Sequence, residues 1–313
     1  MTMVKEDDNR LRNLSASKHV VMTMRFCFLI LAVSLLSTAW GQQAPPPTPS
    51  LTSDEIQQLI RKVADNDLAN DKLQRNYTYL QREEQHRLDG KGRVSSTEIK
   101  TSEILEIYGE QVERLISKDD KPLSDKDAKK EEEKIQKLID KRKDESAEDR
   151  KKREEREEKD REDSRKFVTE VADAYNFTFA GMETLDGRAT YVIDAEPRPG
   201  YQPRMKDAKI LTKLRGRIWI DKDESQLTRF DIQCIDTISF GLFLARIHKG
   251  TRIIYQQTRV NDEVWLPQHV SLKLDARVAL LKEYNLDDDV TYRDYKKFRT
   301  DTKIVPVGEA SQP

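Results

Sequence analysis

Alternation of apolar and polar residues with a period of two is the feature that most limits how this chain can fold. It is clearest in HVSLKLDARV (residues 269–278), where every second side chain is apolar. Comparable segments recur from Asn76 onward and are separated by turn signals such as Asp186-Gly187 and Lys249-Gly250. The pattern predicts strands that have one apolar and one solvated face and are joined mainly by hairpins.

The predicted strands and hairpins span residues 76–88, 92–108, 110–118, 176–197, 215–236, 245–260, 269–278 and 289–298, about 10–11 strands in all. An antiparallel sheet of this size usually curls. Its apolar face must be covered by helices or closed around another group. The predicted fold class is therefore α+β, with a curved antiparallel sheet in the form of a half-barrel.

A helix is predicted immediately before the first strand. Thr52 and Glu55 are spaced as a capping box. They are followed by apolar residues at helical spacing, namely Ile56, Leu59, Ile60 and Val63. This pattern indicates a helix that packs on the sheet of its own chain, in preference to a helix that binds a partner.

A highly charged segment, residues 119–166, interrupts the strands. In its last part, EDRKKREEREEKDREDSRK (148–166), nine basic and nine acidic residues accompany one serine. Acid–base pairs at i, i+4 and the lack of Gly and Pro between Leu123 and Phe167 favour a solvated helix over coil. Ile135, Leu138 and Ile139 form its apolar patch. The prediction is a protruding rod that docks on the sheet only through its early turns.

The N-terminus is typical of a secretory signal. Eleven apolar residues, Phe26–Leu36, follow Arg25 and precede the small residues Ala39 and Gly41. We expect cleavage after Gly41, with translation starting at Met1, Met22 or Met24. A membrane anchor is the alternative, although a spanning helix needs about 20 apolar residues.

The expected domain organisation follows from these boundaries. It comprises a signal peptide (1–41), a Pro-rich linker (42–51), a helix with the first strands (52–118), the charged insertion (119–166), the main antiparallel sheet (167–304) and a disordered tail (305–313).

Residues that carry chemistry are scattered. His86, His248 and His269 lack metal-ligand spacing, and Cys234 lies on the apolar phase of a strand, as expected for a buried side chain. The acidic run Asp287–Asp289 lacks the Gly and distal Glu of a calcium loop, so we interpret it as a solvated turn. No catalytic residue, metal or cofactor is predicted. Basic and acidic residues are balanced, at 56 and 57, which argues against nucleic-acid binding.

Two segments, FAGMETLDGRATYVIDAEP and LRGRIWIDKDESQLTRFDIQ, resemble the LolA/LolB/RseB-like superfamily of exported proteins. The resemblance covers residues 167–304. It implies an incomplete antiparallel barrel with helices over its mouth, which binds acyl chains or other apolar ligands. Two features depart from that pattern: the chain has no acylated N-terminal Cys of the LolB-like type, and it carries the charged insertion.

Together these observations predict an exported, non-catalytic carrier or sensor in the periplasm of a Gram-negative bacterium. Its partner would be a lipid or an acylated protein, or a protein of the envelope, and it would have no stable transmembrane anchor. The candidate apolar lining is Ile218, Ile220, Phe230, Ile232, Val270, Leu272 and Leu274. The alternative is an envelope structural or interaction protein with a closed core and the charged helix as its contact surface. A hydrolase is the least supported reading, because no nucleophile or metal constellation is visible.

Overall fold

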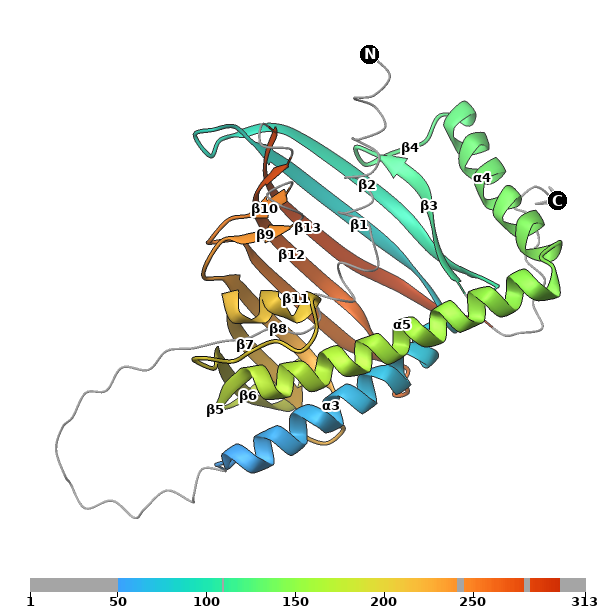
Figure 1. Cartoon of the computed structure of the whole chain (residues 1–313). Coiled ribbons are helices and arrows are strands. Elements are labelled where there is room, and N and C mark those ends of the chain that lie inside the picture. The colour runs from blue at the N-terminus through green and yellow to red at the C-terminus, as the bar shows by residue number, and fades with distance from the viewer. Residues whose placement is uncertain (1–49, 109, 241–244, 279–281, 299–313) are drawn as a thin grey trace.

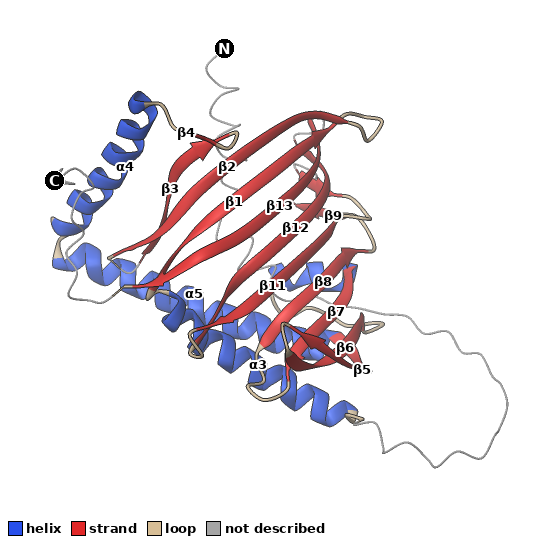
Figure 2. Ribbon diagram, turned by 180° about the vertical axis from the view of Figure 1, so that it is seen from behind, coloured by secondary structure: helices blue, strands red, loops and turns tan. Residues whose placement is uncertain are grey.

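The computed structural model describes residues 50–108, 110–240, 245–278 and 282–298 (Figure 1). The predicted signal peptide, most of the linker and the predicted tail lie outside these residues, so those expectations stay predictions. The described part forms a single large, curved antiparallel sheet with helices on one face (Figures 1 and 2). The predicted α+β half-barrel is confirmed.

The sheet has 13 strands, in the order β4-β3-β2-β1-β13-β12-β11-β8-β7-β6-β5, with β9 and β10 off this path. The strands are β1 (Tyr77–Leu88), β2 (Val94–Ile107), β3 (Glu110–Lys118), β4 (Lys121–Pro122), β5 (Tyr175–Leu185), β6 (Arg188–Pro197), β7 (Leu214–Asp221), β8 (Leu227–Cys234), β9 (Ile238–Phe240), β10 (Ala245–Ile247), β11 (Arg252–Val260), β12 (Val264–Val278) and β13 (Lys282–Lys297).

Two details of the sheet differ from the sequence-based expectation. Strands β4 and β9 are only two and three residues long, too short for an alternation pattern, and they are the strands missing from the predicted count. In addition, the turn at Lys249-Gly250 does not close a hairpin. Strand β10 pairs with β12 and β9, whereas β11 pairs with β8 and β12.

In the part of the chain that the structure describes, three α-helices and a short 3₁₀-helix accompany the sheet. They are α3 (Ser53–Gln74), α4 (Asp125–Lys143), α5 (Ala147–Ala174) and η1 (Asp207–Lys213). The predicted capping box is present at the start of α3, where the Thr52 side chain accepts from the Glu55 amide and the Glu55 carboxylate accepts from the Thr52 amide.

The hydrophobic core lies between the helices and one face of the sheet, here called the inner face. Ile56, Ile60 and Val63 of α3 pack there with Phe167 and Val171 of α5. On the sheet side, the same cluster takes in inward-facing residues of β5 to β8, β11, β12 and β13. The predicted packing of the first helix on its own sheet is therefore confirmed.

Helix α3 is also held by buried polar side chains. Asn70 Oδ1 accepts from the Trp265 amide at 2.8 Å, and Asn70 Nδ2 donates to the Trp265 carbonyl at 2.8 Å. Gln74 Nε2 donates to the same carbonyl at 2.7 Å. Since Trp265 lies at the start of β12, these bonds set where the end of α3 meets the sheet.

The opposite, outer face of the sheet carries alternating charges. Arg217 Nε on β7 lies 2.6 Å from Asp194 Oδ1 on β6, and Arg252 Nε on β11 lies 2.7 Å from Asp231 Oδ1 on β8. Arg217 and Asp231 are themselves cross-strand neighbours. The ladder of opposite charges stabilises the strand pairing and keeps this face solvated.

The charged insertion is two helices rather than one rod. The break lies at residues 144–146, where Glu145 forms ion pairs with Arg142 and Arg153. Helix α4 packs along β3 with Ile135 buried, which confirms docking by the early turns. Beyond Lys166, α5 continues without a break into the core.

Among the described side chains of α5, two acid–base pairs at i, i+4 are formed as predicted. Lys152 Nζ lies 2.6 Å from Glu148, and Lys166 Nζ lies 2.9 Å from Glu162. Arg153, which stands four residues after Asp149, pairs with Glu145 across the break. Because the Glu148–Lys152 and Glu162–Lys166 pairs are exposed, water screens the attraction between their charges, and each pair adds little to the stability of the helix.

We predict that Gly216→Ala destabilises the protein by about 1–3 kcal/mol or more, because a Cβ there overpacks the β7–β8 interface. An added Cβ would lie 2.0 Å from the Asp231 carbonyl oxygen. Gly90→Ala is the matched control, since a Cβ at Gly90 meets nothing within 4 Å. Urea unfolding of both variants measures the difference; equal midpoints would contradict the close approach of the two strands.

Candidate functional site

The predicted apolar lining divides into two groups. Five residues belong to the closed core beneath the helices, with exposed fractions of 7 % or less: Ile218, Ile220, Phe230, Ile232 and Val270. Phe230 stacks on Tyr255 with ring centroids 5.2 Å apart. The remaining two, Leu272 and Leu274 on β12, are half-buried. Contact of any of the seven with a ligand stays a prediction.

Beyond the closed core, the inner face continues across β12, β13, β1 and β2. The extensive helix–strand contacts of the described residues are those of α3 with β5 and β12 and of α4 with β3. Figures 1 and 2 show α3 and α5 at one end of the strands, and none of the described helices lies over the far parts of β1 and β2. Half-buried apolar side chains here include Leu272 and Tyr292, which pack against the margin of the core cluster, and Leu274, Tyr284 and Leu286 farther along the strands.

An acidic side chain stands among these apolar residues. The acidic run lies in the middle of β13, so its interpretation as a solvated turn was wrong. Strand alternation sends Asp288 to the inner face, opposite Leu272 of β12 and Gln85 of β1. Its neighbours Asp287 and Asp289 point to the outer face, where they lie opposite Lys273 and Ser271.

Asp288 is buried, with an exposed fraction of 6 % for the residue. Its Oδ1 has no hydrogen-bond partner among the described residues. Glu83 is on the same face of the adjacent strand β1, opposite Val290 and thus diagonal to Asp288. We call Glu83 and Asp288 the inner-face carboxyl pair.

Burial and like charge perturb the protonation of this pair. Burial, reinforced by the negative charge of Glu83 and Asp289 and opposed by Lys100, raises the pKa of Asp288 to about 7. Burial is also the main cause of the raised pKa of Glu83, with Lys100 again opposing the shift. Lys100 is itself engaged, because its Nζ lies 3.0 Å from Glu98.

A carboxyl group of this kind has two chemical options near neutral pH. In its neutral form it donates one hydrogen bond, and in its ionised form it accepts bonds from a cation or a neutral donor. The pair therefore provides a polar anchor within an apolar surface. This combination is typical of binding sites that orient an apolar ligand through a few polar groups.

The other chemistry-bearing residues are engaged elsewhere. Ring nitrogens of His248 and His269 lie 2.7 Å from carboxylate oxygens of Asp275 and Asp289, and His86 Nδ1 lies 2.8 Å from Thr97. Cys234 is buried, as predicted, and burial raises the pKa of its thiol.

Within the described ranges, no cluster of three or more His, Cys, Asp or Glu could hold a metal ion. None of the described helices is long and apolar enough to cross a membrane.

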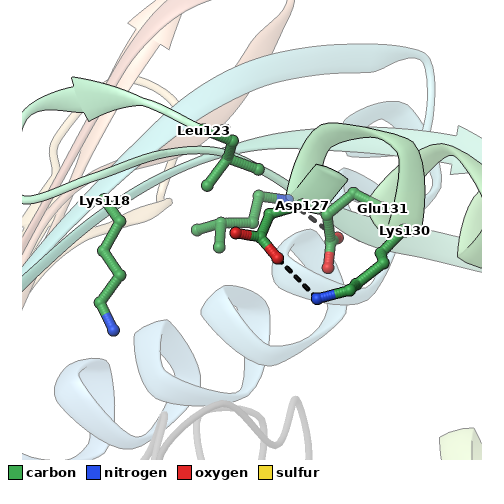
Figure 3. Close-up of a pocket in the computed structure, with 6 residues that line it drawn as sticks. Lys118, Leu123, Asp127, Lys130 and Glu131 are labelled. Carbon is green, nitrogen blue, oxygen red and sulfur yellow. Dashed lines mark hydrogen bonds and ion pairs between the residues drawn. The ribbon is translucent and has the colours of Figure 1, made fainter. Parts of the chain in front are cut away.

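Surface cavities along the described part of the sheet include two candidates for a ligand pocket. The first, of about 290 Å³, lies between α4 and β3 (Figure 3), where Lys130 Nζ lies 2.7 Å from Asp127 and Glu131 accepts from the Leu115 amide. The second, of about 260 Å³, lies at the turns near Gly90 and Gly250 and is bordered by Leu274. Both are below the lower end of the usual volume of ligand pockets, which is about 300 Å³, and both have walls that mix apolar with charged side chains. Neither suits a long acyl chain.

Sequence reasoning missed the inner-face carboxyl pair. The position of Asp288 in the sequence could have indicated it. Asp288 falls on the same alternate positions as the apolar residues Leu286, Val290 and Tyr292, so an acid stands where the strand pattern expects an apolar side chain. Glu83 gave no comparable signal, because its segment, LQREEQHR, is polar at nearly every position. Only the pairing of β1 with β13 shows that the two acids are neighbours.

We predict that Asp288→Asn stabilises the protein at pH 8 and has little effect near pH 4. A pKa raised above its ordinary value means that the native state holds the proton more tightly. The stability contribution of Asp288 is therefore fully present below about pH 4 and is lost as the pH rises through about 7. The expected gain for the variant at pH 8 is on the order of 1–4 kcal/mol.

Chemical denaturation of wild type and variant between pH 4 and 8 measures this dependence. The variant retains a smaller slope, because Glu83 contributes with the same sign. Asp287→Asn on the outer face is the control. Parallel curves for wild type and Asp288→Asn would show that Asp288 ionises normally.

The comparisons with known proteins returned structures only. No family model matches the sequence, and no curated protein matches it. Similar solved structures include a domain described as that of an outer membrane lipoprotein-sorting protein from Vibrio parahaemolyticus (11 % identity, covering 77 % of this chain and 95 % of that one, TM-score 0.31). A LolA superfamily protein from Nitrosomonas europaea matches with 8 % identity over 80 % and 95 % of the two chains, TM-score 0.31.

A third similar structure is a DUF1329 family protein from Desulfovibrio piger, with 11 % identity over 76 % of this chain and 92 % of that one, TM-score 0.27. The LolA-like resemblance indicated by the hairpin pattern thus recurs among the structural comparisons. Since the TM-scores are all near 0.3, these likenesses carry no weight for function. The case for a function therefore depends on the residues of this chain.

Proposed function

We propose that this protein is an exported, non-catalytic carrier or sensor that holds an apolar ligand, a lipid or the acyl chain of a lipidated protein, on the inner face of its half-barrel. The observation that carries the proposal is the apolar row of β12, which runs from buried Val270 through half-buried Leu272 and Leu274, past the part covered by helices. Such a surface is costly to leave in water, and in soluble proteins it marks an interaction site.

The two groups of lining residues have different roles in this proposal. The five fully buried residues form the floor of the half-barrel and are already packed against protein. Ligand contact is assigned to Leu272 and Leu274, together with Leu286 and Tyr292 of the neighbouring strand β13. A curved sheet brings these side chains toward one another, so an extended chain could contact several at once.

Export is proposed from the sequence of residues 1–41, which has the order of a secretory signal. A periplasmic location in a Gram-negative bacterium fits a carrier of lipids or lipidated proteins. It also fits a chain whose single cysteine after Gly41, Cys234, forms no intramolecular disulfide.

One observation favours the alternative, an envelope structural protein without a ligand. Five of the seven predicted lining residues are closed off by the protein's own helices. In that case the paired charges of α4 and α5 would be the contact surface. A ligand-binding measurement separates the two functions.

We predict that the purified full chain binds a neutral apolar probe, N-phenyl-1-naphthylamine, saturably, and that dodecanol displaces it. Leu274→Gln should weaken binding roughly 10-fold or more, because burial of a leucine side chain is worth about 1.5–3 kcal/mol. The matched control is Leu80→Gln, a half-buried leucine of β1 whose cross-strand neighbours Arg293 and Glu103 lie on the outer face.

Native mass spectrometry of the same preparations looks for co-purifying lipid. Absence of bound lipid together with absence of saturable probe uptake would remove the carrier function and leave the structural alternative. Equal weakening by both leucine variants would place the ligand elsewhere than the inner face.

A further inference from the structure

The inner face has a polar feature that an apolar ligand alone does not explain. We infer that the inner-face carboxyl pair, Glu83 and Asp288, binds a primary ammonium group carried by an alkyl-chain ligand. This inference rests on the proposed function, because it names the head-group chemistry of the ligand held on that same face.

The first support is the contrast between neighbouring acids of β13. On the outer face, Asp289 Oδ2 lies 2.7 Å from His269 Nε2, and Asp287 Oδ2 lies 3.7 Å from Lys273 Nζ. Asp288, between them and far more buried, leaves Oδ1 without a partner among the described residues. Thus Asp287 and Asp289 on the outer face have basic partners, whereas the buried Asp288 has an oxygen without a hydrogen-bond donor among the described residues.

The second support is that nearby cations are already committed. Lys100 of β2 is the basic residue nearest in register, opposite Glu83. Its Nζ lies 3.0 Å from Glu98, and the other carboxylate oxygen of Glu98 lies 3.2 Å from Lys118. This arrangement leaves the half-buried Glu83 and the buried Asp288 beside one shared lysine, so the described residues do not neutralise the pair.

An unpaired buried carboxylate is costly in free energy, and such a cost is tolerated where a ligand supplies the missing partner. An ammonium group has three N–H donors. Glu83 and Asp288 offer two carboxyl acceptors, and Gln85, opposite Asp288 and 8 % exposed, offers an amide oxygen as the third. The number of donors and acceptors therefore matches.

A divalent metal fits less well. Calcium takes six to eight oxygen ligands, whereas this location offers two carboxyl groups and one amide. The apolar neighbours Leu272, Val290 and Tyr292 instead favour a ligand whose charged end continues into a hydrocarbon chain. A free small amine would leave those contacts unused.

The protonation of Asp288 adds a dependence on pH. Around it stand Glu83 of β1, Lys100 of β2 and Asp289 of its own strand, while β12 presents the uncharged Leu272. Because Asp288 titrates near pH 7, the attraction for a cation should strengthen between pH 6 and 8 and weaken in acid.

Isothermal titration calorimetry of the full chain at pH 8 tests the inference with three probes: dodecylamine, dodecanol and ethylamine. We expect wild type to bind dodecylamine at least 10-fold more tightly than dodecanol, and ethylamine only weakly because it lacks the chain. The ratio of dodecylamine to dodecanol affinity should fall to about one in the double variant Glu83→Gln/Asp288→Asn. The outer-face control Asp287→Asn should keep the wild-type ratio.

The outcomes separate the two proposals. Equal wild-type affinity for dodecylamine and dodecanol would overturn ammonium recognition while the apolar-ligand function stands. Tight binding of ethylamine would show a site for free amines instead. Failure of every probe to bind would overturn both proposals. If the double variant does not fold, the isosteric single variant Asp288→Asn is tested in its place. An unchanged ratio of dodecylamine to dodecanol affinity in that variant would contradict the inference.

Discussion

Packing of α3 and the last turns of α5 against the inner face of the sheet is the interaction on which the rest of the structure depends. A curved sheet with one apolar face cannot persist in water unless that face is covered. Ile56 and Ile60 from one helix and Phe167 and Val171 from the other supply the cover. Both helices lie toward one end of the strands (Figure 1), so the same interaction that stabilises the fold leaves part of the inner face for another use.

The two faces of the sheet differ in how their charged side chains are paired. On the outer face, acids and bases of adjacent strands meet in register, as Asp194 with Arg217 and Asp231 with Arg252. On the inner face, Asp288 is buried without such a partner. The free energy lost there is a stability cost that packing elsewhere offsets. A polar group kept at such a cost within an apolar surface is the arrangement expected of a site that orients a ligand.

For the charged insertion, the charge pattern predicts helical structure but not how the helices are arranged. Its helical state follows from the spacing of acids and bases and from the missing Gly and Pro. Its division into two helices does not, because the break at Glu145 depends on ion pairs with Arg142 and Arg153 from both sides. Nor does the charge pattern reveal that α5 ends in the core, since that role belongs to the apolar residues from Phe167 onward.

Local sequence by itself determined the strands, most turns, the capped first helix and the apolar phase of β12, because each of these is set by neighbours within a few residues. Tertiary structure decided which strands pair, which apolar residues are closed off, and that Glu83 lies beside Asp288. The pairing of β1 with β13, which places Glu83 beside Asp288, joins residues about 200 positions apart in the chain. The energies of these features arise from burial and from Coulomb interactions between distant segments, which no local pattern encodes. The turn at Lys249-Gly250 makes the same point, since its residues specify a bend while the partners of the flanking strands are chosen by the whole sheet.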